Sequence, residues 1–178
     1  MEKLVLANKE EIAYCYDILD AGREYQKSQG FIQWDDTYPT LDLVKEDVKK
    51  QIGYVLKVDD EIAAYMAITF TEDPFYKDIK GAWSSNDVYC VVHRVAVNPK
   101  FRSQGITTKI FKEVEKLCLE NNIYYIRIDT HHENKLMQHV FEKNGFKYCG
   151  TCFFHGSDKL AYDKILEKKT TIICCFNF

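Results

Sequence analysis

The sequence predicts an α/β fold of the α+β type, in which one central mixed sheet of about seven strands is flanked by helices. Short apolar runs rich in β-branched residues, typical of strands, alternate along the chain with segments whose apolar residues recur at helical spacing. Their order is strand, two helices, three strands, helix, strand, helix and two strands, a mixture that favours a sheet covered by helices. The length of 178 residues fits one domain. We place this domain at residues 1–168 and an apolar C-terminal tail at residues 169–178.

The first strand and the first helix are marked by local patterns. Residues 4–6 form a short apolar run that predicts a strand. Asn8 and Glu11 have the spacing of a capping box, which predicts the start of a helix. Apolar residues then recur at helical spacing, and Gly30 ends the helical region.

An aromatic loop at 31–39 separates this helix from a shorter one expected at 41–50, where the apolar residues share one face. Two strands follow at 54–58 and 62–68. Asp59-Asp60 between them favours a tight turn, so the two strands are expected to form a hairpin.

The middle of the chain contains the clearest strand and the clearest helix. Residues 71–87 include Pro74, Gly81 and several polar side chains, so they predict a loop. Residues 89–97 are nearly continuously apolar, which is typical of a central strand buried on both faces. The apolar stripe along 105–121 predicts an amphipathic helix.

The last part of the chain predicts one more helix between strands. Thr130 and Glu133 have capping-box spacing, and Gly145 follows the basic last turn of the expected helix. The remaining strands are expected at 123–129, 146–154 and 160–165.

Composition limits the classes of function. The 24 basic and 27 acidic residues give a formal net charge of -3, which does not indicate a nucleic-acid partner. No signal peptide or membrane span is recognisable, so we expect a cytoplasmic protein without a membrane partner. Seven cysteines, an odd number, favour free thiols. Cys149, Cys152 and His155 have a loosely metal-like spacing, but a strand points the two cysteines to opposite faces, so we expect no metal site.

A candidate anion site precedes the clearest helix. Residues 95–107 place a buried strand, a polar loop and a glycine directly before the helix start, where backbone N–H groups lack intrahelical partners. Gly105 lets an anion approach the backbone, while Ser103 and Arg102 add a hydroxyl and a charge. The pattern predicts a phosphate or diphosphate site. A loop that uses glycine only for its turn is the alternative.

Arg102-Ser103-Gln104-Gly105-Ile106-Thr107 resembles the Arg/Gln-x-x-Gly-x-Gly/Ala diphosphate motif of the GNAT superfamily of N-acetyltransferases. The preceding Val95-Ala96-Val97-Asn98-Pro99 and the later helix from Asn134 to Gly145-Phe146 also resemble that family. The similarity covers about Val91 to Lys147. It implies a mostly antiparallel GNAT sheet and an acetyltransferase domain that moves an acetyl group from acetyl-CoA directly to a primary amine, without a metal.

The resemblance also implies where acetyl-CoA binds. The backbone of Val95 and Val97 is expected to hydrogen-bond the pantetheine arm like an added strand, and Asn134 is expected to reach the pantetheine or thioester. The diphosphate is expected on the amides of Arg102, Ser103, Gln104, Gly105, Ile106 and Thr107. Thr107 stands where the family prefers glycine or alanine, so its side chain must fit against the diphosphate.

Amine acetylation needs a proton acceptor, because an alkyl amine titrates near the lysine value of about 10.4. His93 is the first candidate base, since it lies on the central strand just before the residues expected to bind pantetheine. His131 is the second. A buried structural histidine and a surface residue are the respective alternatives. Phe141 stands where the family often has a tyrosine that acts as general acid. Tyr148, another tyrosine or solvent is therefore left to protonate the departing coenzyme A thiolate.

The acceptor is expected to be a small-molecule or peptide amine. Trp34 lies in the aromatic loop where the family builds its acceptor pocket, although core packing is the alternative. Arg94 is a candidate for binding an acceptor carboxylate, and a solvated strand residue is the alternative. The apolar tail is compatible with a homodimer.

Two other functions are consistent with the residues. Phe141 favours a non-catalytic acyl-CoA-binding sensor that has the same fold. An unrelated nucleotide-phosphate binder is the third hypothesis, since the anion site alone does not identify the ligand.

Overall fold

One sheet organises the molecule. The computed structural model describes residues 2–154 and 156–168, and its strands are β1 (Glu2–Leu6), β2 (Gly53–Val58), β3 (Glu61–Thr69), β4 (Lys80–Gly81), β5 (Cys90–Val97), β6 (Tyr125–His131), β7 (Lys147–Phe154) and β8 (Ser157–Ile165). In this part of the chain they form a single eight-stranded sheet in the order β1-β2-β3-β5-β6-β8-β7-β4. Neighbouring strands are antiparallel except β5 and β6, which run parallel.

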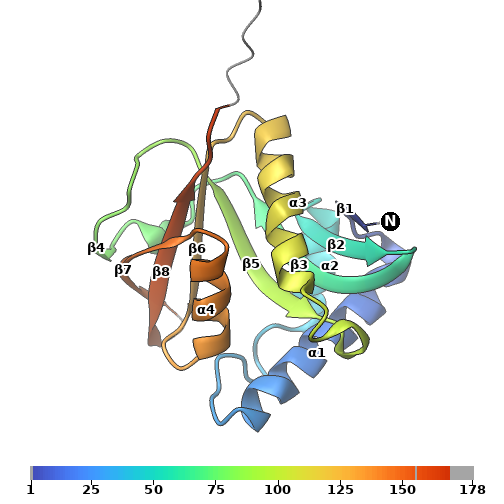
Figure 1. Ribbon diagram of the computed structural model, residues 1–178. Helices are drawn as coiled ribbons and strands as arrows, with labels where there is room; N and C mark the ends of the chain where they lie inside the picture. Colours follow the sequence, from blue (N-terminus) through green and yellow to red (C-terminus); the bar gives the residue numbers. More distant parts are fainter. Residues whose placement is uncertain (1, 155, 169–178) are drawn as a thin grey trace, which may run out of the picture.

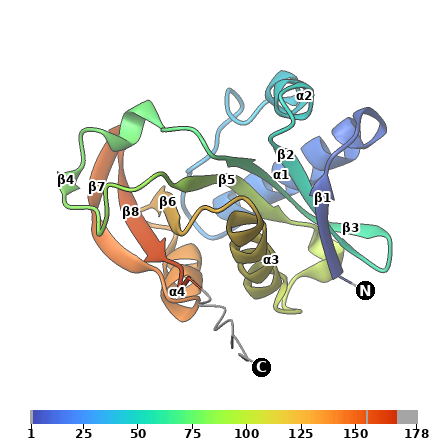
Figure 2. The same ribbon diagram turned by 90° about the horizontal axis from the view of Figure 1, so that it is seen from above.

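Helices cover both faces of this sheet (Figure 1). Helices α1 (Ile12–Ser28) and α2 (Leu41–Lys49) lie on one face, and α3 (Ile106–Glu120) and α4 (Lys135–Lys143) lie on the other. Figure 2 also shows the segment between β3 and β5 crossing the α1–α2 face above β6, β8 and β7. This segment contains the short 3-10 turn η2 (Pro74–Tyr76); two similar turns are η1 (Lys9–Glu11) and η3 (Pro99–Phe101).

Apolar packing fills the space on both faces. The largest cluster lies between the sheet and helices α3 and α4, and includes Phe111 and Phe141. A second cluster, including Leu19 and Val44, lies under α1 and α2. The third lies under the segment between β3 and β5, with Tyr76 at its centre. Because both faces are covered, β5 is buried on both sides, which explains its nearly continuous apolar sequence.

The predicted fold class is confirmed, and most predicted elements are present. The helix expected at 105–121 is α3, and the expected central strand is β5, which lies between β3 and β6. Asn8 and Glu11 form the expected capping box, in which each side chain accepts the other residue's backbone N–H. Asp59 and Asp60 turn the β2–β3 hairpin with positive φ angles of 48° and 67°.

The number of strands differs from the prediction because residues 71–87, expected to be a loop, contain β4. This two-residue strand pairs with β7 through Gly81 and Gly150. The two backbones are so close that a Cβ at Gly81 would lie 2.1 Å from the Cys149 carbonyl oxygen. The contact joins glycines that are distant in sequence, so no local pattern marks it.

The predicted cap of α4 is wrong. Thr130 does not start a helix, because β6 continues through it and pairs it with Leu160 of β8. Asn134 is the N-cap instead, and its side-chain oxygen accepts the Met137 backbone N–H at 3.1 Å. Pairing within the sheet therefore overrides the capping pattern of Thr130 and Glu133.

Two predictions fall outside the described residues, namely the apolar tail at 169–178 and the contribution of His155 to a metal site. Within the described ranges, the helices are too short or too polar for any of them to cross a membrane.

Candidate active site

The central feature of the site is the divergence of β5 and β6. Their parallel pairing is limited to Cys90 with Ile126 and Val91 with Arg127. Beyond Val91, the two strands separate (Figure 1), so the edge of β5 that faces β6 has no strand partner. An extended ligand can therefore hydrogen-bond to this edge as an added strand. Val95 lies along it.

A bulge in β5 directs side chains at this point. Arg94 has a φ of 55°. Ala96 pairs with Tyr65 and His93 pairs with Ala67, so Arg94 and Val95 together face one residue of β3. A bulge interrupts the alternation of side chains between the two faces. His93 and Arg94, although adjacent, both reach elements on the α1–α2 face.

The start of α3 has the geometry expected of an anion site. Gly105 precedes the helix with a φ of 71°, and a Cβ added there would meet no atom within 4 Å. Ser103 also has a positive φ, 62°. The space beside Gly105 at the start of α3 is thus open, and the unpaired first amides and dipole of the helix favour an anion there.

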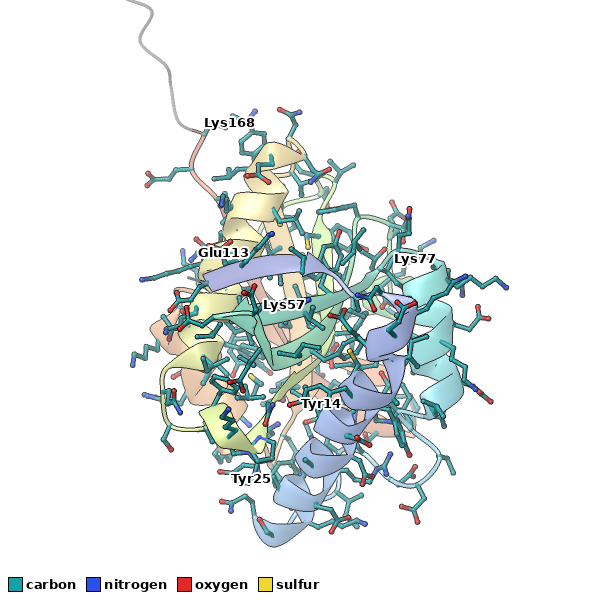
Figure 3. The ribbon with its side chains drawn as sticks, turned by 90° about the vertical axis from the view of Figure 1, so that its right-hand side faces the viewer. Tyr14, Tyr25, Lys57, Lys77, Glu113 and Lys168 are labelled. Atoms are coloured by element: carbon teal, nitrogen blue, oxygen red, sulfur yellow. The ribbon has the colours of Figure 1, made fainter. Side chains whose placement is uncertain are left out.

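The loop between β5 and α3, residues 98–105, contacts helix α1 at two points. Tyr14 and Tyr25 lie along the side of α1 that faces the loop (Figure 3). The Asn98 side-chain amide donates to the Tyr14 hydroxyl at 2.8 Å. The Arg102 guanidinium lies 4.6 Å from the Tyr25 ring centroid and donates to the Ala21 carbonyl at 2.9 Å. The Arg102 side chain therefore holds the loop against α1.

A cavity of about 340 Å³ lies where β5 and β6 diverge. Its walls come from α1, the loop after α1, β5, β6, α4 and β8. Among the predicted site residues, those that line it are Trp34, His93, Arg94, Val95 and Asn134. A second hollow of about 400 Å³ lies between the loop after α1, α2 and residues 73–75. Both hollows are lined by His93 and Arg94, so the two meet at the bulge of β5.

His93 is held between two carboxylates. Its Nε2 lies 2.9 Å from Oδ2 of Asp73, which precedes η2. Its Nδ1 lies 4.0 Å from Oδ1 of Asp129 on β6. The Tyr76 hydroxyl donates to the same Asp129 oxygen at 2.8 Å. The His93 side chain is about one-fifth exposed, at 20%, so it is reachable from the cavity.

The two carboxylates have opposite pKa shifts. Burial raises the pKa of Asp129, although His93 and the Tyr76 hydroxyl act to lower it. Burial also acts to raise the pKa of Asp73, but hydrogen bonds from His93 and the Phe75 amide outweigh it and lower this pKa. Asp73 is therefore the ionised partner that orients the imidazole, with the ring proton on Nε2.

Sequence reasoning missed Asp73, Tyr76 and Asp129. The one local signal was Asp73-Pro74, which is typical of a helix start, and Asp73 does cap η2 by accepting the Phe75 amide. Capping alone does not indicate that the same carboxylate contacts His93. The contacts of Tyr76 and Asp129 join residues that are far apart in sequence.

Arg94 is paired inside the protein. Its Nε and Nη2 donate to the Asp47 carboxylate of α2 at 3.1 and 2.8 Å, and its Nη1 donates to the Tyr38 hydroxyl at 3.3 Å. The Tyr65 hydroxyl also donates to Asp47, at 2.8 Å. The side chains of Arg94 and Asp47 are 10% and 3% exposed, which excludes the alternative of a solvated strand residue.

His131 lies at the end of β6, outside the cavity lining. Burial lowers its pKa, and the charges of Lys159 and His132 act in the same direction. The ring stacks on Phe31 at a centroid distance of 6.2 Å. With His132 and Glu133 it forms, among the described residues, a group whose ligand atoms lie within 4.8 Å of one another. His132 and Glu133 are exposed.

Asn134 and Trp34 connect the cavity walls. The Asn134 side-chain amide donates at 3.0 Å to Oε1 of Gln33, in the loop after α1. Trp34 is 6% exposed and belongs to the cluster under α1 while it also lines the cavity. It therefore serves both as core and as cavity wall.

The position of the expected acid is apolar. Phe141 is 1% exposed and packs edge-on against Phe111 at 5.9 Å. Tyr148 is exposed and lines neither of the two hollows. Tyr38 lines both, and burial raises the pKa of its hydroxyl.

Comparisons with known proteins agree with this architecture. A family model described as the acetyltransferase (GNAT) family matches residues 16–146. A GNAT family acetyltransferase from Streptococcus agalactiae 2603 has a similar structure, with a TM-score of 0.87 and 29% identity over 94% of this chain and 96% of that one. A GNAT family acetyltransferase from Listeria monocytogenes 4b F2365 has a TM-score of 0.73 at 19% identity, over 93% and 95% of the two chains.

The aminoglycoside acetyltransferase AAC(6')-Ib, solved with coenzyme A and kanamycin, has a TM-score of 0.68 and 19% identity, over 93% of this chain and 95% of that one. At this identity the likeness shows a shared fold. No curated protein sequence gives a significant match.

Proposed function

Because this chain belongs to the GNAT acetyltransferase family, we propose that it is an N-acetyltransferase that moves the acetyl group of acetyl-CoA directly to a primary amine. The observation that carries the proposal is the order of three features from the start of α3 back along β5. The space beside Gly105 at the start of α3 is open, the edge of β5 that faces β6 has no strand partner, and the His93 side chain lines the cavity. The first suits a diphosphate, the second an extended arm and the third proton transfer.

The donor site follows from the first two features. The backbone of Val95 and Val97 binds the pantetheine arm, and Asn134 lies on the cavity wall near the expected thioester. The diphosphate is held by the amides of Arg102, Ser103, Gln104, Gly105, Ile106 and Thr107. The open space beside Gly105 supports this assignment.

His93 is the proton acceptor in the proposed reaction. The ammonium group of the acceptor transfers one proton to His93, whose imidazolium is stabilised by Asp73. The neutral nitrogen then forms a bond to the thioester carbonyl carbon, and the carbon–sulfur bond breaks. The thiolate takes up the second proton that leaves the new amide nitrogen, and His93 returns its proton to solvent. His131, outside the cavity lining, is the second candidate base.

The acceptor enters through the second hollow. Trp34 and Arg94 are proposed as walls of its binding site, on the basis of their position in the cavity. We expect the acceptor to be a small-molecule or peptide amine and the protein to act in the cytoplasm without a metal. A homodimer remains a prediction, because the tail lies outside the described residues.

Two measurements test the proposal. Release of the coenzyme A thiol is followed with a panel of primary amines, and coenzyme A binding is measured by calorimetry. Thiol release that requires both acetyl-CoA and an amine supports the enzyme. Tight binding without thiol release across the panel would support the acyl-CoA sensor instead, which the buried Phe141 favours.

A matched pair of glycine variants tests the donor site. Gly105 and Gly156 have φ angles of 71° and 72°, and an added Cβ meets no atom within 4 Å at either position. Gly105→Ala and Gly156→Ala should therefore lose similar stability, about 1–2 kcal/mol. Only Gly105→Ala should weaken coenzyme A binding, by about tenfold or more, since its methyl group enters the space assigned to the diphosphate. Equal affinities for the two variants would contradict the assignment.

A further inference from the structure

Two acceptor atoms face each other across the opening between β5 and β6. Nδ1 of His93 and Oδ1 of Asp129 are 4.0 Å apart, too far for a hydrogen bond to each other. One nitrogen can, however, lie within hydrogen-bonding distance of both, since two contacts of about 2.9 Å span this separation. Both side chains line the cavity of about 340 Å³.

Each of these two groups is held by a partner behind it. Asp73 binds the far nitrogen of His93 at 2.9 Å, and Asp73 is itself positioned by the Phe75 amide at 2.8 Å. The Tyr76 hydroxyl donates to Asp129 at 2.8 Å, and Tyr76 is 1% exposed. The two acceptor atoms are thus fixed before any ligand arrives, which reduces the entropic cost of binding.

Two carboxylates flank His93 at this opening. Arg94, on the adjacent wall, is paired with Asp47 through two hydrogen bonds. Lys159 of β8 also lines the cavity, and its charge acts to lower the pKa of Asp129. Asp73 is ionised on the other side of His93. The Asp129 carboxylate, with Asp73 behind His93, therefore gives the opening the acceptors that an ammonium group needs.

We propose that the reacting nitrogen of the acceptor binds as a primary ammonium between His93 Nδ1 and Asp129 Oδ1, which makes Asp129 a substrate-binding residue. One N–H of the ammonium donates to Asp129. A second N–H transfers its proton to His93, and the electron pair that this leaves on nitrogen is available to attack the thioester. The inference rests on the proposed function and deepens it, because it names the side chain that binds the reacting nitrogen. A protonated tertiary amine has a single N–H, so it cannot both donate to Asp129 and transfer a proton to His93.

Asp129→Asn is the first test, because asparagine keeps an oxygen for the Tyr76 hydroxyl and removes the charge. Steady-state thiol release with propylamine should show a KM for the amine raised by about ten- to a hundredfold, with the KM for acetyl-CoA changed by less than about twofold. Asp36→Asn is the matched control. Asp36 is on the same loop as Trp34 but its side chain is 91% exposed, and its removal should change neither KM.

A binding measurement separates this inference from the proposed function. Propylamine is titrated into the coenzyme A complex while the imidazole nitrogens of His93 are followed by nuclear magnetic resonance. The wild-type signal should shift with saturation, and half-saturation in Asp129→Asn should need about tenfold more amine or greater. A saturable, Asp129-dependent shift without any thiol release would overturn the proposed enzyme and retain the ammonium site.

The opposite results would overturn the ammonium site. Equal half-saturation in the wild type and Asp129→Asn, or no shift of the His93 signals, contradicts binding between the two residues. Thiol release whose KM for propylamine is the same in both proteins contradicts it as well, while leaving the acetyltransferase activity established. Trimethylamine that competes as strongly as propylamine would contradict the selection for a primary ammonium.

Discussion

Removing the carboxylate of Asp47 should destabilise the fold strongly, because it leaves the Arg94 guanidinium buried without its counter-charge. Asp47 accepts two hydrogen bonds from Arg94 and one from the Tyr65 hydroxyl, and its side chain is 3% exposed. Breaking a buried ion pair by truncating one partner costs about 3–5 kcal/mol. This is a large part of the roughly 5–15 kcal/mol by which a domain is stable.

The expected size of the effect can be measured by thermal and urea unfolding of Asp47→Ala. For a chain of this length, a loss of 1 kcal/mol lowers Tm by about 2–4 °C, so the predicted decrease is roughly 6–20 °C. The double variant Asp47→Leu with Arg94→Met removes both charges and fills the space with apolar side chains. It should recover most of the stability, because the cost comes from the unpaired charge.

The reasoning is refuted if Asp47→Ala lowers the free energy of unfolding by less than about 1 kcal/mol, the value of an exposed ion pair. It is also refuted if the double variant is as unstable as the single one. A stable double variant has a further use. Its KM for the amine reports whether the Arg94 charge contributes to acceptor binding, without the complication of misfolding.

Three further predictions concern side chains in and next to the cavity wall. The pKa of Asp129 is raised in the folded protein, so ionisation of this carboxyl opposes folding, and Asp129→Asn should raise Tm near neutral pH. This gain in Tm should disappear as the pH falls below the ordinary aspartate pKa of 3.8, which a series of Tm measurements against pH checks. The pKa of His131 is lowered, so the wild type should lose stability as the pH falls below 6.5, and His131→Gln should show a smaller loss in urea unfolding over the same range. Asn134→Ala should cost about 1 kcal/mol in the free energy of unfolding through the lost cap of α4. Gln33→Ala, which removes the contact to Asn134 and keeps the cap, should cost less; an equal cost would argue against the cap.

Local patterns were sufficient to predict most elements and the glycine-led start of α3. The capping box of Asn8 and Glu11, the Asp59-Asp60 turn and the glycine before α3 each depend on residues within a few positions of one another. Helix and turn formation respond to such short-range interactions, so the sequence alone predicted them.

Local patterns failed where sheet pairing decided the outcome. Thr130 and Glu133 have the spacing of a helix start, yet pairing with β8 keeps Thr130 in β6. The strand β4 depends on the close approach of Gly81 to Gly150, which are 69 positions apart in numbering (150 − 81). Both partner strands were predicted from the sequence, but local patterns do not show which strand pairs with which segment.

By itself, then, the sequence determined the order of the elements, the buried central strand and the glycine-led start of α3, because these follow from periodicity and short-range backbone rules. Only the tertiary structure decided which polar groups surround His93. The bulge at Arg94 determines which face of the sheet the β5 side chains occupy. Oδ1 of Asp129, on the neighbouring strand β6, lies 4.0 Å from Nδ1 of His93, and the segment after β3 contributes Asp73. These contacts arise from strand register and crossover connections, which join residues with no sequence relationship to one another.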